Sequence, residues 1–229
     1  MAVLTYFGHS AVQIVSGDAN ILIDPYISEN PLSPVTKEEL KPDYIIITHG
    51  HGDHIGDTVE IAKSSNSTVI SNFEIATYFQ KKGVKTHGMS IGGSREFPFG
   101  KVKFTIAHHS SGLNTPDEGM VYMGSPCGVI VSVDGMNLYH AGDTGLFLDM
   151  KLIGELNDLD VAMLPIGDNF TMGIEDAIRA ADFLKAKLNI PIHYNTFELI
   201  KADPEEFVVS VEALNLSAKV LNPGDSIEI

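Results

Sequence analysis

Histidine and aspartate are concentrated in one short stretch of the chain. Residues 48–57 read THGHGDHIGD, and within a sequence of 229 residues and nine histidines they hold His49, His51, Asp53 and His54. Imidazole nitrogen and carboxylate oxygen bind zinc, iron, nickel and manganese, and a pair of such ions activates water for hydrolysis. A solvated polar turn is the alternative, but a His-x-His-x-Asp-His cluster directly after the apolar run YIIIT favours a metal site.

The spacing within this stretch suits two ions. His49 and His51 are two residues apart, so both can point the same way from a nearly extended segment. Gly50 and Gly52 make a turn before the following aspartate and histidine sterically easy. Four ligands cannot fill two sites, so the remaining ligands must come from later in the chain.

The composition excludes several other classes of protein. Lys and Arg number 15 against 30 Asp and Glu, a net charge of −15, so we expect no nucleic-acid partner. No run approaches the ~20 apolar residues of a membrane span, so we expect no membrane contact and a cytoplasmic location. The single cysteine, Cys127, excludes a cysteine-based zinc site and is expected to be buried. The partner that remains is a small-molecule substrate, and a homo-oligomer is allowed.

Hydrophobic periodicity identifies the elements that must position these side chains. Strands are predicted at residues 3–7, 11–15, 20–24, 44–48, 68–71, 84–87, 101–109, 127–133, 136–141, 160–166, 189–194, 218–221 and 226–229. Helices are predicted at residues 58–65, 73–82 and 174–186, and a further helix begins at Pro204 with Asp203 and Glu206 as a capping box. In the strand at 101–109, alternation predicts that Phe104 and Ile106 face the core.

An internal repeat supports a duplicated architecture. Residues 6–22 align without a gap on residues 122–138, and seven of the 17 positions are identical. Two similar halves predict an α/β fold, a four-layer α-β-β-α sandwich with two facing sheets and helices outside. No linker interrupts the chain, so we predict one domain over residues 1–229.

The motifs resemble those of a known family across nearly the whole chain. They are GHS, IDP, THGHGDHIGD, NFE, GMSIGGS, AHHSS, YHAGDTG, LPIGDNFTMG and IPIHYNTF. On these motifs the sequence resembles the metallo-β-lactamase fold superfamily and, more closely, the UPF0173 family of metal-dependent hydrolases, which is similar to L-ascorbate-6-phosphate lactonases. The resemblance implies a metallo-β-lactamase-like fold.

The resemblance also completes the set of metal ligands. Of the adjacent His108 and His109, the family pattern selects His109, whereas strand alternation places His108 in the core. Asp143 of HAGDT is the implied bridging carboxylate, and His193 closes a late strand. The resulting prediction is that one metal is bound by His49, His51 and His109, and the other by Asp53, His54 and His193, with Asp143 shared.

Residues around the metals carry further predictions. The resemblance implies that Asp24 braces the ligand loop, and that His9 faces the metal pocket, where substrate contact or proton transfer competes with simple packing. Asp53 and His9 are therefore the predicted catalytic residues. Substrate contacts are assigned to Asn169, Tyr194 and Asn195, although Tyr194, Asn195 and the adjacent Thr196 could equally serve in packing or capping. The resemblance also suggests that bacterial relatives tend to have Gly-Gly-His where this chain has Asp168 and Asn169.

Two divalent ions then predict the chemistry. We expect a metal-dependent hydrolase in which hydroxide bound by a dinuclear centre attacks an ester, lactone or phosphodiester of a small molecule. Zinc is the first candidate metal, and manganese, iron and nickel are alternatives. The alternative functions are a diiron redox enzyme and a metallo-nuclease acting on RNA or DNA.

Overall fold

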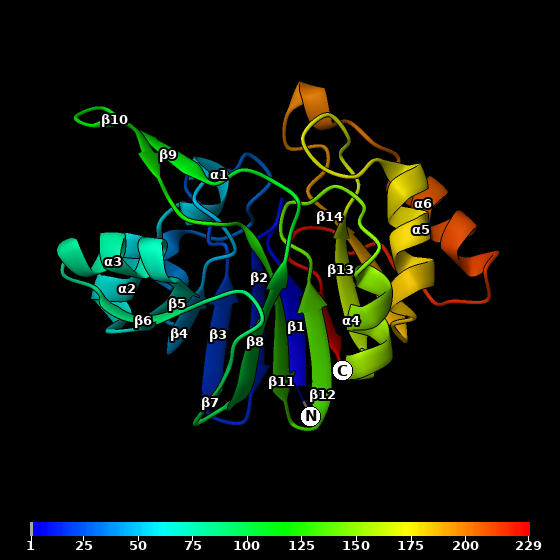
Figure 1. Ribbon diagram of the computed structural model, residues 1–229, viewed down its shortest axis with the longest axis horizontal. Helices are drawn as coiled ribbons and strands as arrows, with labels where there is room; N and C mark the ends of the chain where they lie inside the picture. Colours follow the sequence, from blue (N-terminus) through cyan, green and yellow to red (C-terminus); the bar gives the residue numbers. More distant parts are fainter. Residues whose placement is uncertain (1) are drawn as a thin grey trace.

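The computed structural model describes residues 2–229. Within them, the strands form two large sheets that face each other and a separate two-stranded hairpin (Figure 1). The first sheet has the order β15-β1-β2-β3-β4-β5-β6 and consists of β1 (Ala2–Tyr6), β2 (Val12–Ser16), β3 (Ala19–Ile23), β4 (Tyr44–Ile46), β5 (Thr68–Asn72), β6 (Lys85–Met89) and β15 (Ser226–Glu228). The second has the order β14-β13-β12-β11-β8-β7 and consists of β7 (Ser94–Phe97), β8 (Gly100–Ile106), β11 (Cys127–Val133), β12 (Met136–His140), β13 (Val161–Pro165) and β14 (Leu188–Ile192).

The two sheets are built in the same way. In the first, β1, β2 and β3 pair antiparallel and are followed by the parallel strands β4 and β5. In the second, β8, β11 and β12 pair antiparallel and are followed by the parallel strands β13 and β14. The sequence repeat is offset within the hairpins, because Ile14 pairs with Ile21 whereas Ile130 pairs with Tyr139, two residues beyond the aligned position. A shift of two residues keeps each side chain on the same face, so both hairpins bury equivalent faces.

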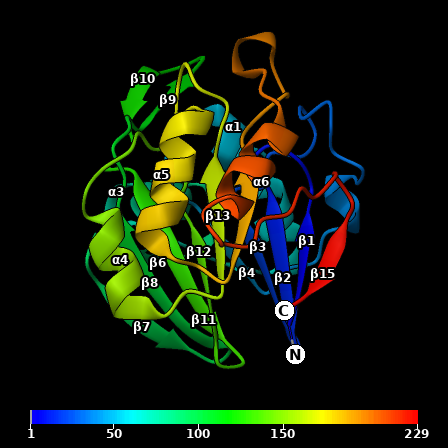
Figure 2. The same cartoon turned by 90° about the vertical axis from the view of Figure 1, so that its right-hand side faces the viewer.

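Helices cover the outer face of each sheet. The short α1 (Gly52–Ile55), α2 (Thr58–Ser65) and α3 (Phe73–Lys81) belong to the first half, and α4 (Met150–Asn157), α5 (Ile174–Leu184) and α6 (Pro204–Glu212) cover the second sheet (Figure 2). Leu4, Phe104 and Val129 are buried between the sheets, whereas Phe79 and Phe207 are buried under the helices of the two halves. This arrangement confirms the predicted four-layer sandwich. Within residues 2–229, no helix has the length and apolarity needed to cross a membrane.

Several local predictions were wrong. Ile106 is 37% exposed, because β8 ends there and the chain leaves the sheet. At the start of α6, the Asp203 carboxylate accepts a hydrogen bond from the backbone N–H of Glu205 (3.0 Å), not from that of Glu206. Of residues 218–221, predicted as a strand, Ala218 makes one isolated bridge to Asn189. The hairpin of β9 (Gly112–Thr115) and β10 (Gly119–Tyr122) and the helix α4 had no counterpart among the predicted elements.

Candidate metal centre

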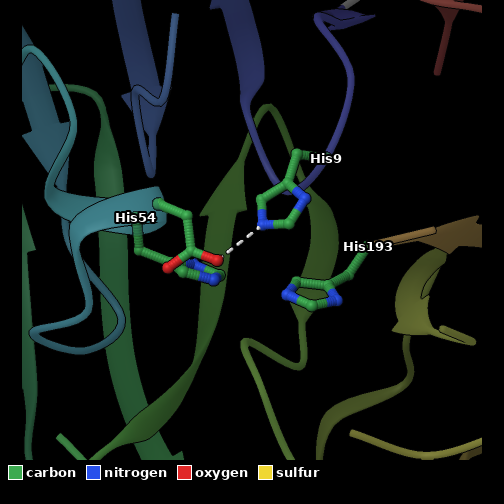
Figure 3. Close-up of side chains that lie close together, drawn as sticks. His9, His54 and His193 are labelled. Carbon is green, nitrogen blue, oxygen red and sulfur yellow. Dashed lines mark hydrogen bonds and ion pairs between the residues drawn. The ribbon is translucent and has the colours of Figure 1, made fainter. Parts of the chain in front are cut away.

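The predicted metal ligands converge at one edge of the two sheets, where β3, β4, β13 and β14 end. His54 lies in α1, directly after the loop that leaves β4, and His193 follows β14. His9 lies in the turn between β1 and β2. Figure 3 shows these three imidazoles pointing toward one another from segments that are far apart in the sequence. The edge where parallel strands end is the usual position of a site in an α/β fold.

The first group of ligands surrounds one position. It consists of His49, His51, His109 and Asp143, whose ligand atoms all lie within 4.8 Å of one another. Nδ1 of His51 lies 3.0 Å from Nε2 of His49 and 3.2 Å from Nε2 of His109. Four ligands at tetrahedral zinc distances lie about 3.4 Å apart. The spacing of these nitrogens therefore fits a single divalent ion.

The second group surrounds a neighbouring position. It consists of His9, Asp53, His54 and His193, again with ligand atoms within 4.8 Å of one another. Asp53 Oδ2 lies 3.2 Å from His9 Nε2, and the His9 and His193 rings have centroids 4.1 Å apart. His9 therefore lies against the three predicted ligands of this position and contacts Asp53 through Nε2.

Asp143 lies between the two groups. Its Oδ2 is 3.1 Å from His193 Nε2 and 3.5 Å from His109 Nε2, and its Oδ1 is 3.2 Å from His54 Nε2. One carboxylate thus reaches imidazoles of both positions. This is the geometry that a bridging ligand requires.

Unpaired polar atoms at the centre fit a cation. Among residues 2–229, His54 Nε2, Asp143 Oδ1 and both ring nitrogens of His193 are buried and have no partner in hydrogen-bond geometry, although the ion-pair distances above are short. Buried polar atoms without partners cost free energy and are rare in folded proteins. A divalent ion coordinated by His54 Nε2, Asp143 Oδ1 and one nitrogen of His193 would remove most of this cost, so the residues present fit a metal centre.

Asp24 orients two of the imidazoles. Its Oδ2 accepts a hydrogen bond from His54 Nδ1 (2.8 Å) and another from the Thr48 hydroxyl (2.6 Å). Because the Thr48 hydroxyl already donates to Asp24, it must accept from His49 Nδ1, 3.0 Å away. Both imidazoles then carry their proton on Nδ1 and turn Nε2 toward the metal positions. Asp24 thus has the bracing position predicted for it, and Thr48 is a positioning residue that the sequence did not reveal.

Two serines hold the ligand loop against the segment of His109, which follows β8. The Gly50 N–H donates to Ser111 Oγ (3.0 Å), and Ser111 in turn donates to the Met123 carbonyl (3.1 Å). Ser110 Oγ lies 3.3 Å from His51 Nε2 and leaves Nδ1 free. A Cβ on Gly50 would lie 2.2 Å from the Met123 Cβ, so glycine is required at this close approach.

The charges of the centre are strongly coupled. Burial disfavours a charged imidazole, but the carboxylates of Asp143 and Asp24 outweigh burial and raise the pKa of His54 well above its usual value. Burial would raise the pKa of Asp143, but the His193 and His54 imidazoles hold it well below its usual range. The metal-free centre therefore keeps a proton on His54 at the position where a metal would bind.

His9 is held as a neutral imidazole. It is fully buried, and burial and the neighbouring His193 lower its pKa to about 4. Nδ1 lies 2.9 Å from the Thr196 hydroxyl, and Nε2 lies 3.2 Å from Asp53. Since an ionised carboxylate only accepts, Nε2 carries the proton and Thr196 donates to Nδ1. Thr196 is thus a second hydroxyl that holds an imidazole of the centre.

The residues predicted to contact substrate are not brought to the centre. Tyr194 packs in the apolar cluster under α5 and α6, and burial raises its pKa to about 12. The Asn195 side chain accepts a hydrogen bond from the Ala202 N–H (3.0 Å) and so closes its own loop. Asn169 is exposed in the loop after β13, and no contact joins it to the metal ligands within residues 2–229.

Two further histidines are excluded from the metal positions. His108 is exposed and stacks on Phe147 with ring centroids 4.9 Å apart, so it is not the core residue that strand alternation predicted. His140 accepts from the Gly142 N–H through Nδ1 and lies 3.0 Å from the Ser10 carbonyl through Nε2. Both of its nitrogens are occupied by backbone groups, so its role is to join the two halves.

Known proteins that are similar to this chain include metal-dependent hydrolases, which agrees with the metal centre described above. The family model "Beta-lactamase superfamily domain" matches residues 19–194. A "UPF0173 metal-dependent hydrolase" from Geobacillus thermodenitrificans is 54% identical over 226 residues, which cover 99% of each chain. The structure of Igni18, a metallo hydrolase from Ignicoccus hospitalis, is 41% identical with a TM-score of 0.90 and covers 100% of this chain and 99% of its own. The metallo-β-lactamase fold protein YhfI from Bacillus subtilis shares the fold at 16% identity and a TM-score of 0.72, covering 100% and 99%.

Proposed function

This chain is a metal-dependent hydrolase that belongs to the UPF0173 family of the β-lactamase superfamily, and we propose that it hydrolyses an ester, lactone or phosphodiester of a small molecule at a centre of two divalent metal ions. The observation that carries the proposal is Asp143, whose two oxygens reach imidazoles of both ligand groups. Lactones are the first class to test, because the sequence resembles a family that is similar to L-ascorbate-6-phosphate lactonases.

The two positions have different ligands. His49, His51 and His109 would hold the first ion, and Asp53, His54 and His193 the second, with Asp143 shared. Zinc is the first candidate because three imidazoles and a carboxylate in tetrahedral spacing suit it. Two bound ions would lower the pKa of a shared water, polarise the scissile carbonyl or phosphoryl oxygen, and stabilise the developing negative charge.

The chain's own residues fix this geometry. His9 donates from Nε2 to Asp53 and so limits the orientations of that carboxylate. With a pKa of about 4, His9 is neutral at pH 7. It can therefore hold Asp53 in place, but it is a poor store of an extra proton for the leaving group. We assign protonation of the leaving group to solvent.

The alternative functions have less support. A nuclease needs cationic surface to meet phosphate backbone, whereas this chain has a net charge of −15. A diiron redox enzyme would be indicated by iron in the isolated protein together with oxygen or peroxide turnover. The redox alternative does not explain the UPF0173 relatives that are named metal-dependent hydrolases.

Paired substitutions at adjacent histidines test the proposal. The metal-loaded protein, with its metal content measured by elemental analysis, is assayed against esters, lactones, thioesters and phosphodiesters with and without chelator. We expect His109→Ala and Asp143→Ala to reduce turnover to background while circular dichroism shows a retained fold. His108→Ala is the matched control and should keep wild-type turnover. Near-normal turnover by His109→Ala, or turnover that survives chelation, contradicts the proposal.

A further inference from the structure

Two aromatic side chains, Phe197 and Tyr26, form a wall beside the second metal position. Phe197 lies on the loop after His193, and its ring centroid is 5.4 Å from that of His9. Tyr26 follows Asp24, and its ring centroid lies 5.5 Å from His9 and 6.3 Å from Phe197. Each ring therefore comes from a segment that also supplies a residue of the metal centre, and both rings pack on the imidazole that contacts Asp53.

The wall is rigid, and part of it is open to solvent. The Tyr26 hydroxyl donates to the Glu29 carbonyl (2.8 Å), which fixes a ring that is only 7% exposed. The loop of Phe197 is closed by a hydrogen bond from the Asn195 N–H to the Ile200 carbonyl (2.8 Å), and Ile200 is fully buried. Phe197 itself remains 37% exposed. A large aromatic ring held in place with a free face offers a surface for an apolar group.

No Lys or Arg lies in the segments that carry the metal ligands, Tyr26 and Phe197, and Lys37, which comes close to the segment after Tyr26, is paired with Asp57 at 3.4 Å. The sequence has no Lys or Arg in residues 1–36, 42–62, 104–150, 152–178 and 188–200. These ranges contain all of the metal ligands, His9, Asp24, Tyr26 and Phe197. The next cation along the Phe197 loop, Lys201, is paired with Glu198 at 2.7 Å. A phosphate remote from the scissile bond is usually held by Arg or Lys, and these segments supply neither.

We propose that the site takes an uncharged lactone or ester whose apolar substituent packs against Phe197, which is supported by Tyr26, and that it disfavours substrates carrying a remote phosphate. This inference rests on the proposed hydrolase function and narrows its substrate class. The reacting group would face the metal positions, and the substituent would reach the exposed part of the Phe197 ring. Phosphorylated sugar lactones become poor substrates, although they share the reacting bond.

Matched lactones test the substrate class. The metal-loaded protein is assayed with δ-valerolactone, δ-decalactone, glucono-δ-lactone and its 6-phosphate. We expect the alkyl chain of δ-decalactone to raise kcat/KM at least about tenfold over δ-valerolactone. We expect the phosphate to lower kcat/KM relative to glucono-δ-lactone, and added salt to narrow that difference. If, at low ionic strength, kcat/KM is higher for the 6-phosphate than for glucono-δ-lactone, the inferred substrate class is wrong. The proposed hydrolase function is unaffected by that result.

Substitutions on one turn test the wall itself. Phe197→Ala should lower kcat/KM for δ-decalactone about tenfold more than for δ-valerolactone, mainly through KM. Leu199, which is 66% exposed on the same turn, provides the control Leu199→Ala, which should change neither substrate. Equal loss for both lactones in Phe197→Ala, or no loss for either, contradicts an apolar contact at this residue.

A binding measurement separates this inference from the proposed function. The δ-lactam analogue of δ-decalactone keeps the ring and alkyl chain and resists hydrolysis, so its affinity is measured by calorimetry whether or not any lactone is turned over. We expect about tenfold weaker binding to Phe197→Ala than to wild type or Leu199→Ala. If no lactone or ester is hydrolysed but this difference in affinity persists, the hydrolase proposal fails, whereas the apolar contact at Phe197 is supported. Equal affinities of the wild type and of Phe197→Ala for the lactam contradict an apolar contact at Phe197.

Discussion

Asp24 connects two of the metal-binding imidazoles through one carboxylate. It accepts from His54 directly and from His49 through the Thr48 hydroxyl, and it is fully buried. A carboxylate is suited to this position because it only accepts hydrogen bonds. The orientation of both Nε2 atoms thus depends on a residue that is not itself one of the proposed metal ligands.

Replacing this carboxylate should weaken metal binding while the fold is retained. In Asp24→Asn, an amide NH2 group faces the N–H and O–H groups that donated hydrogen bonds to the carboxylate. Because these bonds are lost, the two imidazoles are no longer held in one orientation. We expect metal affinity to fall about 10- to 100-fold, measured by competition with a chromogenic chelator. The exposed Asp18 gives the control Asp18→Asn, which should bind metal as wild type does. Wild-type affinity in Asp24→Asn would remove Asp24 from the centre.

Metal binding should release protons from His54. Asp143 and Asp24 overcome burial and raise the pKa of this imidazole, so the metal-free protein holds its proton at pH 7. A metal at Nε2 must displace that proton, so affinity is greatest above the raised pKa and falls as pH decreases below it. Calorimetric titrations in two buffers of different ionisation enthalpy at pH 7 should give the release of at least one proton per centre. Heats that do not depend on the buffer would contradict this protonation state.

At the scale of elements, the short helix α1 is fixed between the ligand loop and the loop after β3. Gly56 ends α1 with φ of +41°, and its N–H donates to the Gly52 carbonyl. A Cβ on Gly56 would lie 2.2 Å from the Pro25 carbonyl oxygen. Since backbone cannot yield as a flexible side chain does, glycine at this position allows the two metal-centre loops to pack.

We therefore expect Gly56→Ala to destabilise the protein by about 2–3 kcal/mol, because it combines a positive φ with a backbone clash. Chemical denaturation of the metal-free protein measures the change without a contribution from ligand binding. Gly52→Ala is the matched control in the same helix, since a Cβ there has no neighbour within 4 Å. If the Gly56→Ala variant proved as stable as the Gly52→Ala variant, the Pro25 loop would have to move freely.

At the scale of the whole molecule, the metal centre joins the two halves of the sandwich. His49 and His54 follow β4 of the first sheet, whereas His109, Asp143 and His193 follow strands of the second. The His193 N–H also donates to the His9 carbonyl (2.7 Å), so backbone bonds cross at the same place. Ligands from both halves mean that a metal bound here stabilises their association.

Chelation should therefore lower the thermal stability of the entire fold. A metal that binds only the folded state adds about 4 kcal/mol at a thousandfold excess over its Kd, which corresponds to a shift of roughly 10 °C in Tm for a chain of this size. Differential scanning calorimetry with and without chelator measures the shift, and Asp143→Ala should show a smaller one. Equal Tm values in both conditions would mean that the centre contributes nothing to the association of the halves.

The sequence by itself determined the alternation of strands and helices, the two similar halves and the concentration of ligands at residues 49–54. Helix α2 and strand β11 begin and end at the predicted residues, because an uninterrupted hydrophobic period is a local property of the chain. The four-layer fold followed from pairing two such halves. The choice of His109 over His108 came from a family motif, since strand alternation gave the wrong environment for His108.

Only the tertiary structure decided what surrounds those ligands. Thr48 and Thr196 bond to histidines through their hydroxyls, and Phe197 packs on His9 from the opposite end of the chain, a partnership that no local pattern encodes. Tyr194 and Asn195 adjoin a ligand in sequence, yet the left-handed backbone at His193 and Asn195 turns them toward the core and their own loop. Proximity along the chain sets which residues share a loop, whereas the packing of one sheet on the other sets which side chains meet.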